Sequence, residues 1–416
     1  MPKHPLLPLL SFLMLTACQE KAPNLEEGLT LWPQQNNTQL AFYNDKGNGV
    51  FSVPRSTLDE RFTLTQKGEH LHMSLKDNPW AGIQFTLPEA VDLSPYREQG
   101  VVALEVNVEA SSELSMEVQL GCGEGCLRRR ELHSEFVDLE GQGWQPVRIP
   151  FSCFAREGDE FDSVAQPLAL AMGGSGELSL RSARMLPAGE ANIQCTDYDK
   201  LAVTPATLNP HWARPWWLPR HEEKKAIAAQ EEIQLVFLGD SITQGWEKEG
   251  RAVWQERYAP RGALNLGFGG DRTENVLWRL QQGAVDKMAP KALVLMIGTN
   301  NTGHRQDAAE VTAAGVKAIL DELKARLPDT RILLLGIFPR GAEADDPLRQ
   351  LNADINRLIE QFADGEQVVY RNINRVFLDD EGRLSSDIMP DYLHPNEVGY
   401  RLWADAMDKE IEQLMQ

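Results

Sequence analysis

Two fold classes follow one another along this chain: an all-β domain over residues 31–200, expected to be an antiparallel sandwich or jelly roll, and an α/β domain over residues 233–416. The first region alternates apolar and polar residues between clusters of Gly, Pro, Asn and Asp, which is typical of an antiparallel sheet. The second alternates short apolar runs with helical segments, which predicts a parallel sheet with helices on both faces. A chain of 416 residues suits two or three domains.

The individual elements follow from the same patterns. In the all-β domain the alternating runs predict strands at 101–108, 114–120, 144–150 and 178–185. In the α/β domain the apolar runs predict strands at 233–238, 263–266, 292–297, 331–337 and 367–370. Helices are expected at 243–256, 272–281, 307–327, 347–363 and 396–414. Open sheets of this kind carry their sites at the carboxyl ends of the strands.

The N-terminus predicts export. A basic tip precedes the apolar stretch from Leu6 to Leu15, which is too short to span a bilayer, so residues 1–17 are expected to be a signal peptide. The following Leu-Thr-Ala-Cys resembles the bacterial lipoprotein box, which implies that Cys18 is lipidated and that residues 18–30 form a tether. Because Gln19 rather than Asp follows, the resemblance implies the outer membrane, facing the periplasm or the cell surface. An ordinary signal peptide is the alternative.

Charge and cysteine content limit the partners. The formal net charge of −20 argues against nucleic acid and against a polybasic contact with a membrane surface. Four cysteines remain after Cys18, and an even number in an exported protein indicates disulfides. We expect Cys122 to pair with Cys126 and Cys153 with Cys195, although four cysteines allow three pairings. A zinc site is the alternative, but no histidine has suitable spacing beside them.

Residues 201–232 are expected to be a linker and a lead-in helix. Trp212, Trp216 and Trp217 lie there among four prolines. Such tryptophans either pack the linker against a domain or form a platform on which sugars stack, and packing is the favoured interpretation.

Part of the all-β domain has a more specific likeness. The stretch from Gly121 to Cys126, then Trp144, then the run from Ile149 to Phe154, resembles the galactose-binding-like β-domain appended to bacterial family 3 exo-glucosidases. The resemblance covers roughly residues 95 to 190. It implies a jelly roll with a carbohydrate-binding role, and a spacer domain is the alternative.

Four segments of the α/β domain supply the parts of an acyl-transfer site. Ser241 follows the first strand at a strand-to-helix turn, where its hydroxyl is free to face a ligand. Gly270 follows the second strand and presents its N–H with no side chain in the way, and Asn300 ends the third. Asp391 and His394 are three residues apart, so the carboxylate can orient the imidazole, which then takes the serine proton.

These blocks are identified as those of the SGNH (GDSL) hydrolase family, and they most resemble the platelet-activating-factor acetylhydrolase branch and its bacterial relatives. The resemblance covers roughly residues 207 to 416. It implies a flavodoxin-like sheet and no metal or cofactor. It also implies Ser241 as nucleophile, His394 as base and Asp391 as its orienter. The N–H groups of Ser241 and Gly270, with the side chain of Asn300, would form the oxyanion hole.

The sequence therefore predicts a serine ester hydrolase that removes short acyl groups, above all acetyl, from carbohydrate through an acyl-Ser241 intermediate. Its partners would be an acylated carbohydrate or another small ester, and a membrane through the lipid anchor. The alternatives are a lipid esterase or thioesterase of the cell envelope, a non-catalytic carbohydrate-binding lipoprotein, and a structural envelope lipoprotein.

Overall fold

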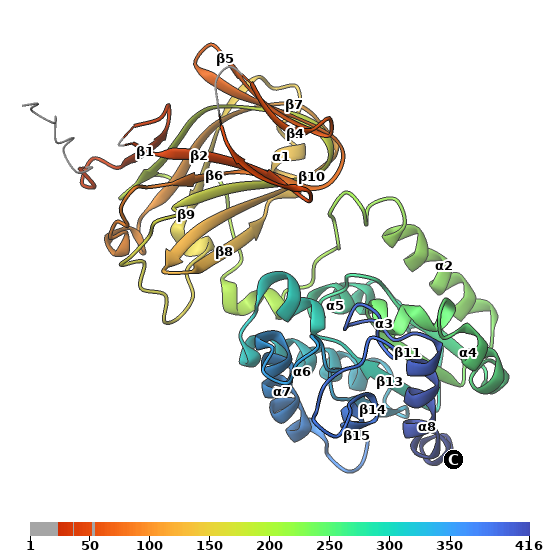
Figure 1. The fold of residues 1–416 in the computed structure, drawn as a ribbon. Helices are drawn as coiled ribbons and strands as arrows, with labels where there is room; N and C mark the ends of the chain where they lie inside the picture. The colour runs from red at the N-terminus through yellow and green to blue at the C-terminus, as the bar shows by residue number, and fades with distance from the viewer. Residues whose placement is uncertain (1–23, 36, 52–54) are drawn as a thin grey trace, which may run out of the picture.

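The computed structural model describes residues 24–35, 37–51 and 55–416, which form a β-domain and an α/β domain joined by a linker (Figure 1). The expected signal peptide, Cys18 and the first part of the tether lie outside the described residues. Among the residues that are described, the helices are too short or too polar to cross a membrane.

The β-domain is a single antiparallel sheet of ten strands that curls on itself. The long strand β10 lies between β6 and β7, and its two halves pair with different segments of each neighbour. Register shifts near Gly174, where φ is +90°, let β10 bend. The strands are β1 (Leu29–Trp32), β2 (Gln39–Asn44), β3 (Gly47–Val50), β4 (Arg55–Asp59), β5 (Phe62–Lys67), β6 (His70–Thr86), β7 (Val101–Gly123), β8 (Cys126–Glu131), β9 (Trp144–Pro150) and β10 (Leu168–Leu186).

The predicted all-β class is confirmed, but the strands expected at 101–108 and 114–120 are one continuous strand, β7. The polar residues between them do not form a turn, because β7 bends there while still pairing with β10. One short helix, α1 (His133–Val137), packs beside β7. Alternate residues of the long strands point inward and form one buried apolar core.

Two disulfides cross-link the β-domain. The structure joins Cys122 to Cys126, which closes the turn between β7 and β8, and it joins Cys153 to Cys195. Cys122, Cys126 and Asp159 place ligand atoms within 4.8 Å of one another, but the disulfide uses both sulfurs and Arg128 forms an ion pair with Asp159. This cluster is therefore a cross-link beside an ion pair.

The second domain is a parallel five-stranded sheet in the order β12-β11-β13-β14-β15, the flavodoxin-like order, so the predicted class is confirmed. The strands are β11 (Leu235–Gly239), β12 (Ala263–Gly267), β13 (Ala292–Met296), β14 (Arg331–Leu335) and β15 (Val368–Arg371). Both faces are covered, which explains why the strands are apolar throughout. Helices α5 (Thr273–Gln281), α6 (Ala309–Arg326) and α7 (Pro347–Ile359) cover one face, and α4 (Arg251–Arg257) and α8 (Glu397–Leu414) the other.

The helix expected at 243–256 is wrong. The chain instead forms α3 (Ser241–Gln244), a 3₁₀ turn over Gly245–Glu247 and α4. The break follows from packing: Trp246 turns inward and is fully buried, and Tyr400 of α8 lies against Gly245 and Gly250, where any larger side chain would overlap it.

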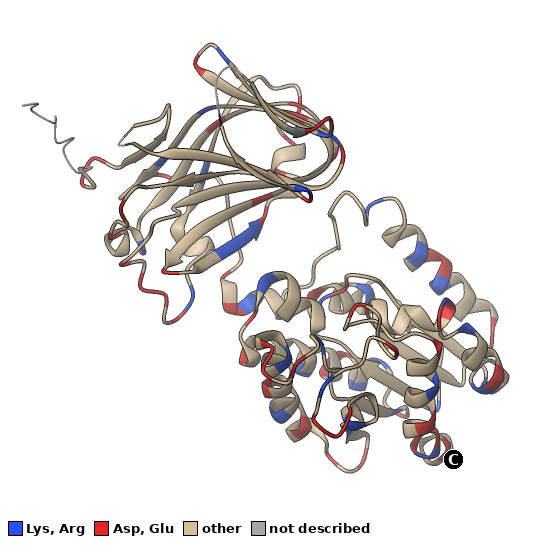
Figure 2. Cartoon of the chain, viewed as in Figure 1, with Lys and Arg blue, Asp and Glu red and all other residues tan. Residues whose placement is uncertain are grey.

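The lead-in helix α2 (Trp217–Gln230) packs against the α/β domain, with Trp217 fully buried against Phe268 and Trp278. Trp212, by contrast, is 43% exposed. The favoured interpretation of packing tryptophans thus describes Trp217 fully and Trp212 in part, since the partly exposed ring of Trp212 also lies against Gly270. Figure 2 shows that acidic and basic residues are scattered over both domains, with one basic stretch, Arg128 to Arg130, along β8 on the side of the β-domain that faces the second domain.

Candidate active site

Ser241 lies at the carboxyl end of β11, where the chain turns from strand to helix. Asp240 caps the following helix: its side chain accepts a hydrogen bond of 2.9 Å from the N–H of Ile242. Burial raises the pKa of Asp240 to about 7. Gly239 allows the tight turn, since a Cβ there would overlap the backbone of Met296. The first residue of α3 is therefore presented at the edge of the sheet.

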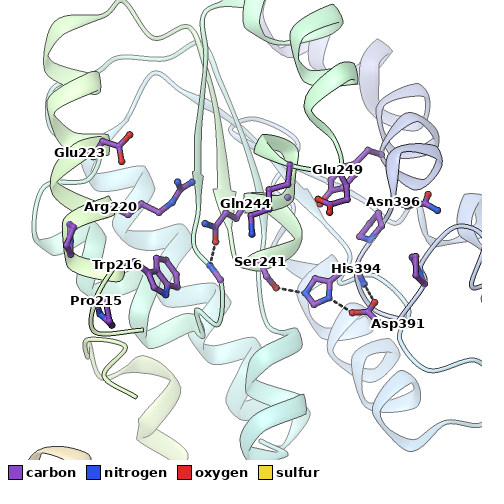
Figure 3. A pocket seen from close by; sticks show the side chains of 17 residues that line it. Pro215, Trp216, Arg220, Glu223, Ser241, Gln244, Glu249, Asp391, His394 and Asn396 are labelled. Carbon is purple, nitrogen blue, oxygen red and sulfur yellow. Dashed lines mark hydrogen bonds and ion pairs between the residues drawn. The ribbon is translucent and has the colours of Figure 1, made fainter. Parts of the chain in front are cut away.

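The structure brings Ser241, His394 and Asp391 together in one hydrogen-bonded row (Figure 3). The hydroxyl oxygen of Ser241 lies 2.9 Å from Nε2 of His394, and Nδ1 of His394 lies 2.6 Å from a carboxylate oxygen of Asp391. With the Asp391 carboxylate accepting from Nδ1–H, the lone pair of Nε2 faces the serine proton. This arrangement can deprotonate the hydroxyl as it attacks a carbonyl carbon.

The loop before α8 fixes the two partners of the serine. The second carboxylate oxygen of Asp391 accepts from the N–H groups of Leu393 and His394, at 3.1 and 2.7 Å. Partial burial raises the pKa of Asp391, but the hydrogen bonds from His394 outweigh burial and hold that pKa below its usual value. Asn396 then caps α8 by accepting from the N–H of Gly399. The carboxylate is therefore ionised and held in place at neutral pH.

Gly270 follows Gly269, which lies close to the side chain of Ser241, but neither Gly270 nor Asn300 lines the open cleft. The side-chain amide of Asn300 donates to the carbonyl oxygen of Asp271 at 2.9 Å, which holds it next to the loop that carries Gly270. Gly270 has a φ of +80°, and a Cβ there would overlap the ring of Trp212. In the part of the chain that the structure describes, the N–H groups of Ser241 and Gly270 donate to no protein acceptor. These N–H groups are free to bind a developing oxyanion.

The triad opens into a cleft of about 950 Å³. Figure 3 shows Trp216 and Arg220 on one side of Ser241, opposite His394. Gln244 also lines the cleft, and its side-chain oxygen accepts from the N–H of Gly269 at 2.7 Å. The sequence interpretation did not include Trp216, Arg220 or Gln244 in the site. The tryptophans of the linker were the one signal that could have pointed to this wall.

A buried ion pair supports the loop behind the site. Asp271 and Arg279 are both fully buried and form an ion pair at 2.7 Å, and Trp217 donates to Asp271 at 2.6 Å. Burial raises the pKa of Asp271 to about 6, against the opposing effect of Arg279. Asp271 therefore connects the Gly270 loop to α5 and to the lead-in helix.

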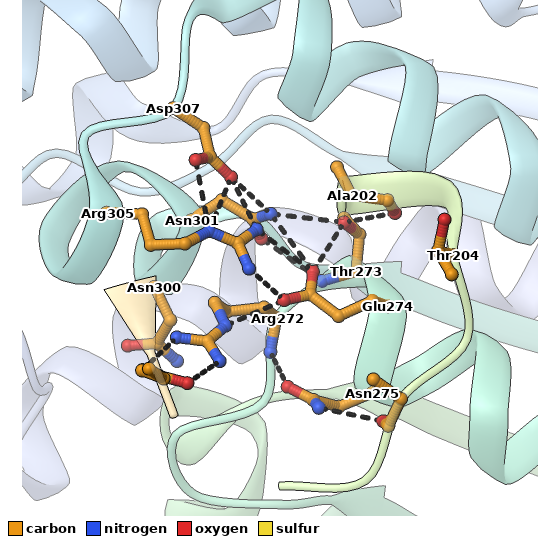
Figure 4. A network of polar contacts seen from close by, with 12 residues as sticks. Ala202, Thr204, Arg272, Thr273, Glu274, Asn275, Asn300, Asn301, Arg305 and Asp307 are labelled. Carbon is orange, nitrogen blue, oxygen red and sulfur yellow. Dashed lines mark hydrogen bonds and ion pairs between the residues drawn. The ribbon is translucent and has the colours of Figure 1, made fainter. Parts of the chain in front are cut away.

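A larger polar network joins the same loop to the β-domain (Figure 4). The guanidinium of Arg272, 4% exposed, donates two hydrogen bonds of 2.8 Å to Glu131 of β8, and its Nε donates to Glu274. Arg305 pairs with Glu274 and with Asp307. The two domains are therefore held together two residues from Gly270, by side chains that the sequence did not single out.

Comparison with known proteins agrees with this site. Residues 237–402 match the GDSL-like lipase/acylhydrolase family, and residues 64–185 match the galactose-binding domain-like family. The chain is 36% identical over 200 residues to the platelet-activating factor acetylhydrolase IB subunit alpha1 of Homo sapiens, which covers 48% of this chain and 84% of the relative.

Two solved structures have weaker likenesses. The acetylxylan esterase of Geobacillus stearothermophilus is 20% identical with a TM-score of 0.37, and covers 44% of this chain and 94% of its own. The exo-1,3/1,4-beta-glucanase of a Pseudoalteromonas species is 14% identical with a TM-score of 0.34, and covers 43% of this chain and 23% of its own. The family match and the extended identity to the acetylhydrolase subunit agree with one another. The chain thus belongs to the GDSL-like lipase/acylhydrolase family and is a carboxylic ester hydrolase that carries a galactose-binding-like domain at its N-terminal side.

Proposed function

We propose that this esterase removes short acyl groups, above all acetyl, from the hydroxyl groups of carbohydrates. The observation that carries the proposal is that the Ser241–His394–Asp391 row faces a cleft, and that Trp216 forms part of the wall of this cleft. An aromatic face beside polar groups suits a sugar ring, which is apolar on its faces and polar at its edge. The galactose-binding-like domain supports a carbohydrate substrate, and the name of the acetylhydrolase relatives supports acetyl as the acyl group.

The reaction would proceed in two halves. Ser241 attacks the ester carbonyl while Nε2 of His394 takes its proton, and the negative charge on the carbonyl oxygen is stabilised by the N–H groups of Ser241 and Gly270 and by Asn300. The C–O bond breaks, and His394 returns the proton to the departing sugar hydroxyl. Water, deprotonated by His394, then attacks the carbonyl carbon of the acyl-Ser241 ester; the bond from that carbon to the serine oxygen breaks, His394 returns the proton to this oxygen, and acetate is released.

The preferred length of the acyl group is tested by hydrolysis of 4-nitrophenyl esters from acetyl to decanoyl. A Ser241→Ala variant is measured beside the unmodified protein. We expect the highest kcat/KM for acetyl and loss of turnover in Ser241→Ala. Acetate release from partially acetylated xylo-, manno- and gluco-oligosaccharides then tests the sugar. A preference for octanoyl or longer esters would instead indicate a lipid or thioester substrate, and no turnover of any ester would indicate a binding protein.

We also propose that Cys18 carries a lipid that anchors the protein to the bacterial cell envelope, in the outer membrane. The lipoprotein-like sequence before Cys18 and the two disulfides of the β-domain support export. In a producing bacterium, the protein should fractionate with outer membranes, whereas a Cys18→Ser variant should not. Equal fractionation of the two would overturn the anchor.

A further inference from the structure

A second hollow, of about 410 Å³, lies where the two domains and the linker meet. The β-domain contributes Trp80, Glu117 and Arg129, and the linker contributes His211 and Trp212. The α/β domain closes it with residues of the Arg272 loop and of the turn after Asn300. Neither the ester hydrolysis nor the family assignment gives this hollow a role.

Several contacts make the hollow a fixed feature of the fold. The hydroxyl of Ser115 on β7 lies 2.9 Å from Nδ1 of His211, and it accepts from the N–H of His211 at 2.6 Å. Arg214 donates to the carbonyl of Leu114, which holds the linker against the same strand. The Arg272–Glu131 pair closes the opposite side. The walls are therefore positioned before any ligand arrives, which lowers the entropic cost of binding.

The chemistry of the walls suits a neutral, polyhydroxylated ring. Trp212 and the partly exposed Trp80 offer aromatic faces. The guanidinium of Arg129 is exposed and forms no hydrogen bond or ion pair within the described ranges, so its donors are available to hydroxyl oxygens. Glu117 adds an acceptor. The lining has no large excess of charge that would attract an ion, because Arg272 is already paired with Glu131 and Arg129 interacts electrostatically with Glu117.

The hollow also shares a wall with the active site. Trp212 stacks on Trp216 with ring centroids 6.4 Å apart and an interplanar angle of 29°. Trp216 lines the catalytic cleft with Ser241, whereas Trp212 lines the second hollow and lies over Gly270. A ligand that crosses this tryptophan pair would contact both spaces at once.

We propose that the interdomain hollow is a second sugar subsite, which binds a neighbouring ring of the same glycan whose acetyl group lies at Ser241. This inference rests on the proposed function and extends it: the substrate is an acetylated oligosaccharide or polysaccharide rather than an acetylated monosaccharide. The Trp212–Trp216 pair supports the chain between the two positions. The β-domain then contributes to substrate binding through Trp80 and Arg129, on the face that meets the linker.

Two variants and a matched control test the subsite. Trp80→Ala and Arg129→Ala each remove one proposed sugar-binding side chain of the β-domain, and neither residue belongs to the Ser241–His394–Asp391 row. Trp144→Ala is the control, because Trp144 is a partly exposed tryptophan of the same domain that packs against Arg181 outside both spaces. The substrates are 4-nitrophenyl acetate and the partially acetylated oligosaccharides named above. Binding of the same oligosaccharides to the Ser241→Ala protein is measured by calorimetry.

We expect Trp80→Ala and Arg129→Ala to raise KM for acetylated oligosaccharides, and Kd in the Ser241→Ala background, by about tenfold. KM and kcat for 4-nitrophenyl acetate should not change, and Trp144→Ala should change neither substrate. The subsite is overturned if both variants bind and hydrolyse oligosaccharides as the unmodified protein does, or if the Ser241→Ala protein binds none of them. Failure of the proposed function would differ: no acetate would be released, while the calorimetric comparison would still decide the subsite.

Discussion

His394 has one hydrogen-bond partner on each ring nitrogen, and the two partners have different tasks. Asp391 lies 2.6 Å from Nδ1 and fixes the tautomer, whereas Ser241 lies 2.9 Å from Nε2 and loses its proton there. An Asp391→Asn variant keeps the shape of this row but allows the amide to donate to Nδ1, so that Nε2 carries the hydrogen. We expect kcat for 4-nitrophenyl acetate to fall about 10³–10⁴-fold.

Asp387→Asn is the matched control for that variant, because Asp387 is an exposed carboxylate of the same loop whose side chain is outside the row. It should retain the activity of the unmodified protein. Equal activity of the Asp391→Asn protein would contradict the role assigned to Asp391.

Asn300 has a task that is separate from proton transfer. Its amide is 6% exposed and donates one hydrogen to the carbonyl of Asp271, which leaves the second hydrogen for the substrate oxyanion. Asn300→Ala should lower kcat for 4-nitrophenyl acetate about 10²–10³-fold with a much smaller change in KM, because the lost interaction forms in the transition state. A rise in KM at constant kcat would instead place Asn300 in substrate binding.

The residues that react could be predicted from the sequence, whereas the residues that surround them could not. Ser241, Asp391 and His394 occur in short local patterns at element ends, and such patterns are visible in one sequence. Trp216 and Arg220 reach the cleft only because α2 packs across the carboxyl edge of the sheet. The position of α2 depends on contacts between segments that are far apart in the sequence, and these contacts cannot be predicted from a short sequence pattern.

Helix α2 carries a histidine whose titration affects stability. His221 is 1% exposed and packs between Trp217 and Trp278. Burial, followed by the nearby charge of Arg279, lowers its pKa from 6.5 to about 4. The unfolded chain therefore binds this proton more readily than the folded one between these two pH values. The contribution of His221 to folding is complete above pH 6.5 and is lost as the pH falls towards 4.

A His221→Phe variant should remove this dependence, since phenylalanine suits the aromatic surroundings and does not titrate. The free energy of unfolding is measured by urea titration at pH 7.5 and at pH 4.5. It should fall less on acidification in the variant than in the unmodified protein, and the two falls should differ by at most about 3 kcal/mol. Asp240 and Asp271 have raised pKa values, so their protonation at acidic pH favours the folded state and opposes the effect of His221. Because both residues titrate in the two proteins alike, their effect cancels in the comparison. Parallel pH dependences would refute this role of His221.

The elements themselves show where periodicity is a reliable guide. The five strands of the parallel sheet lie where apolar runs predicted them, because a strand covered on both faces must be apolar along its length. The segment 243–256 has the composition of a helix, yet the inward turn of Trp246 and the contact of Tyr400 with Gly245 divide it. Tertiary packing thus overrides local preference directly beside the site.

The two domains are joined by polar contacts between side chains and backbone as well as by the linker. Arg156 of the β-domain donates to the carbonyls of Arg305 and Gln306, each at 2.6 Å, and Tyr198 donates to Asp307. Together with the Glu131–Arg272 pair, these contacts fix the β-domain beside the Gly270 loop. We therefore expect the protein to unfold in a single calorimetric transition.

Glu131→Gln should weaken that coupling. The variant leaves the guanidinium of Arg272 with one charged partner, Glu274, in an environment that excludes water. We expect a loss of about 2 kcal/mol in the free energy of unfolding and a separation of the single transition into two. Because Arg272 lies two residues from Gly270, kcat for 4-nitrophenyl acetate should also fall severalfold while KM changes little.

Glu105→Gln is the control, since Glu105 pairs with Arg181 on the exposed surface of the β-domain. If Glu131→Gln unfolds in one transition at the temperature of the unmodified protein, the buried pair does not hold the domains together.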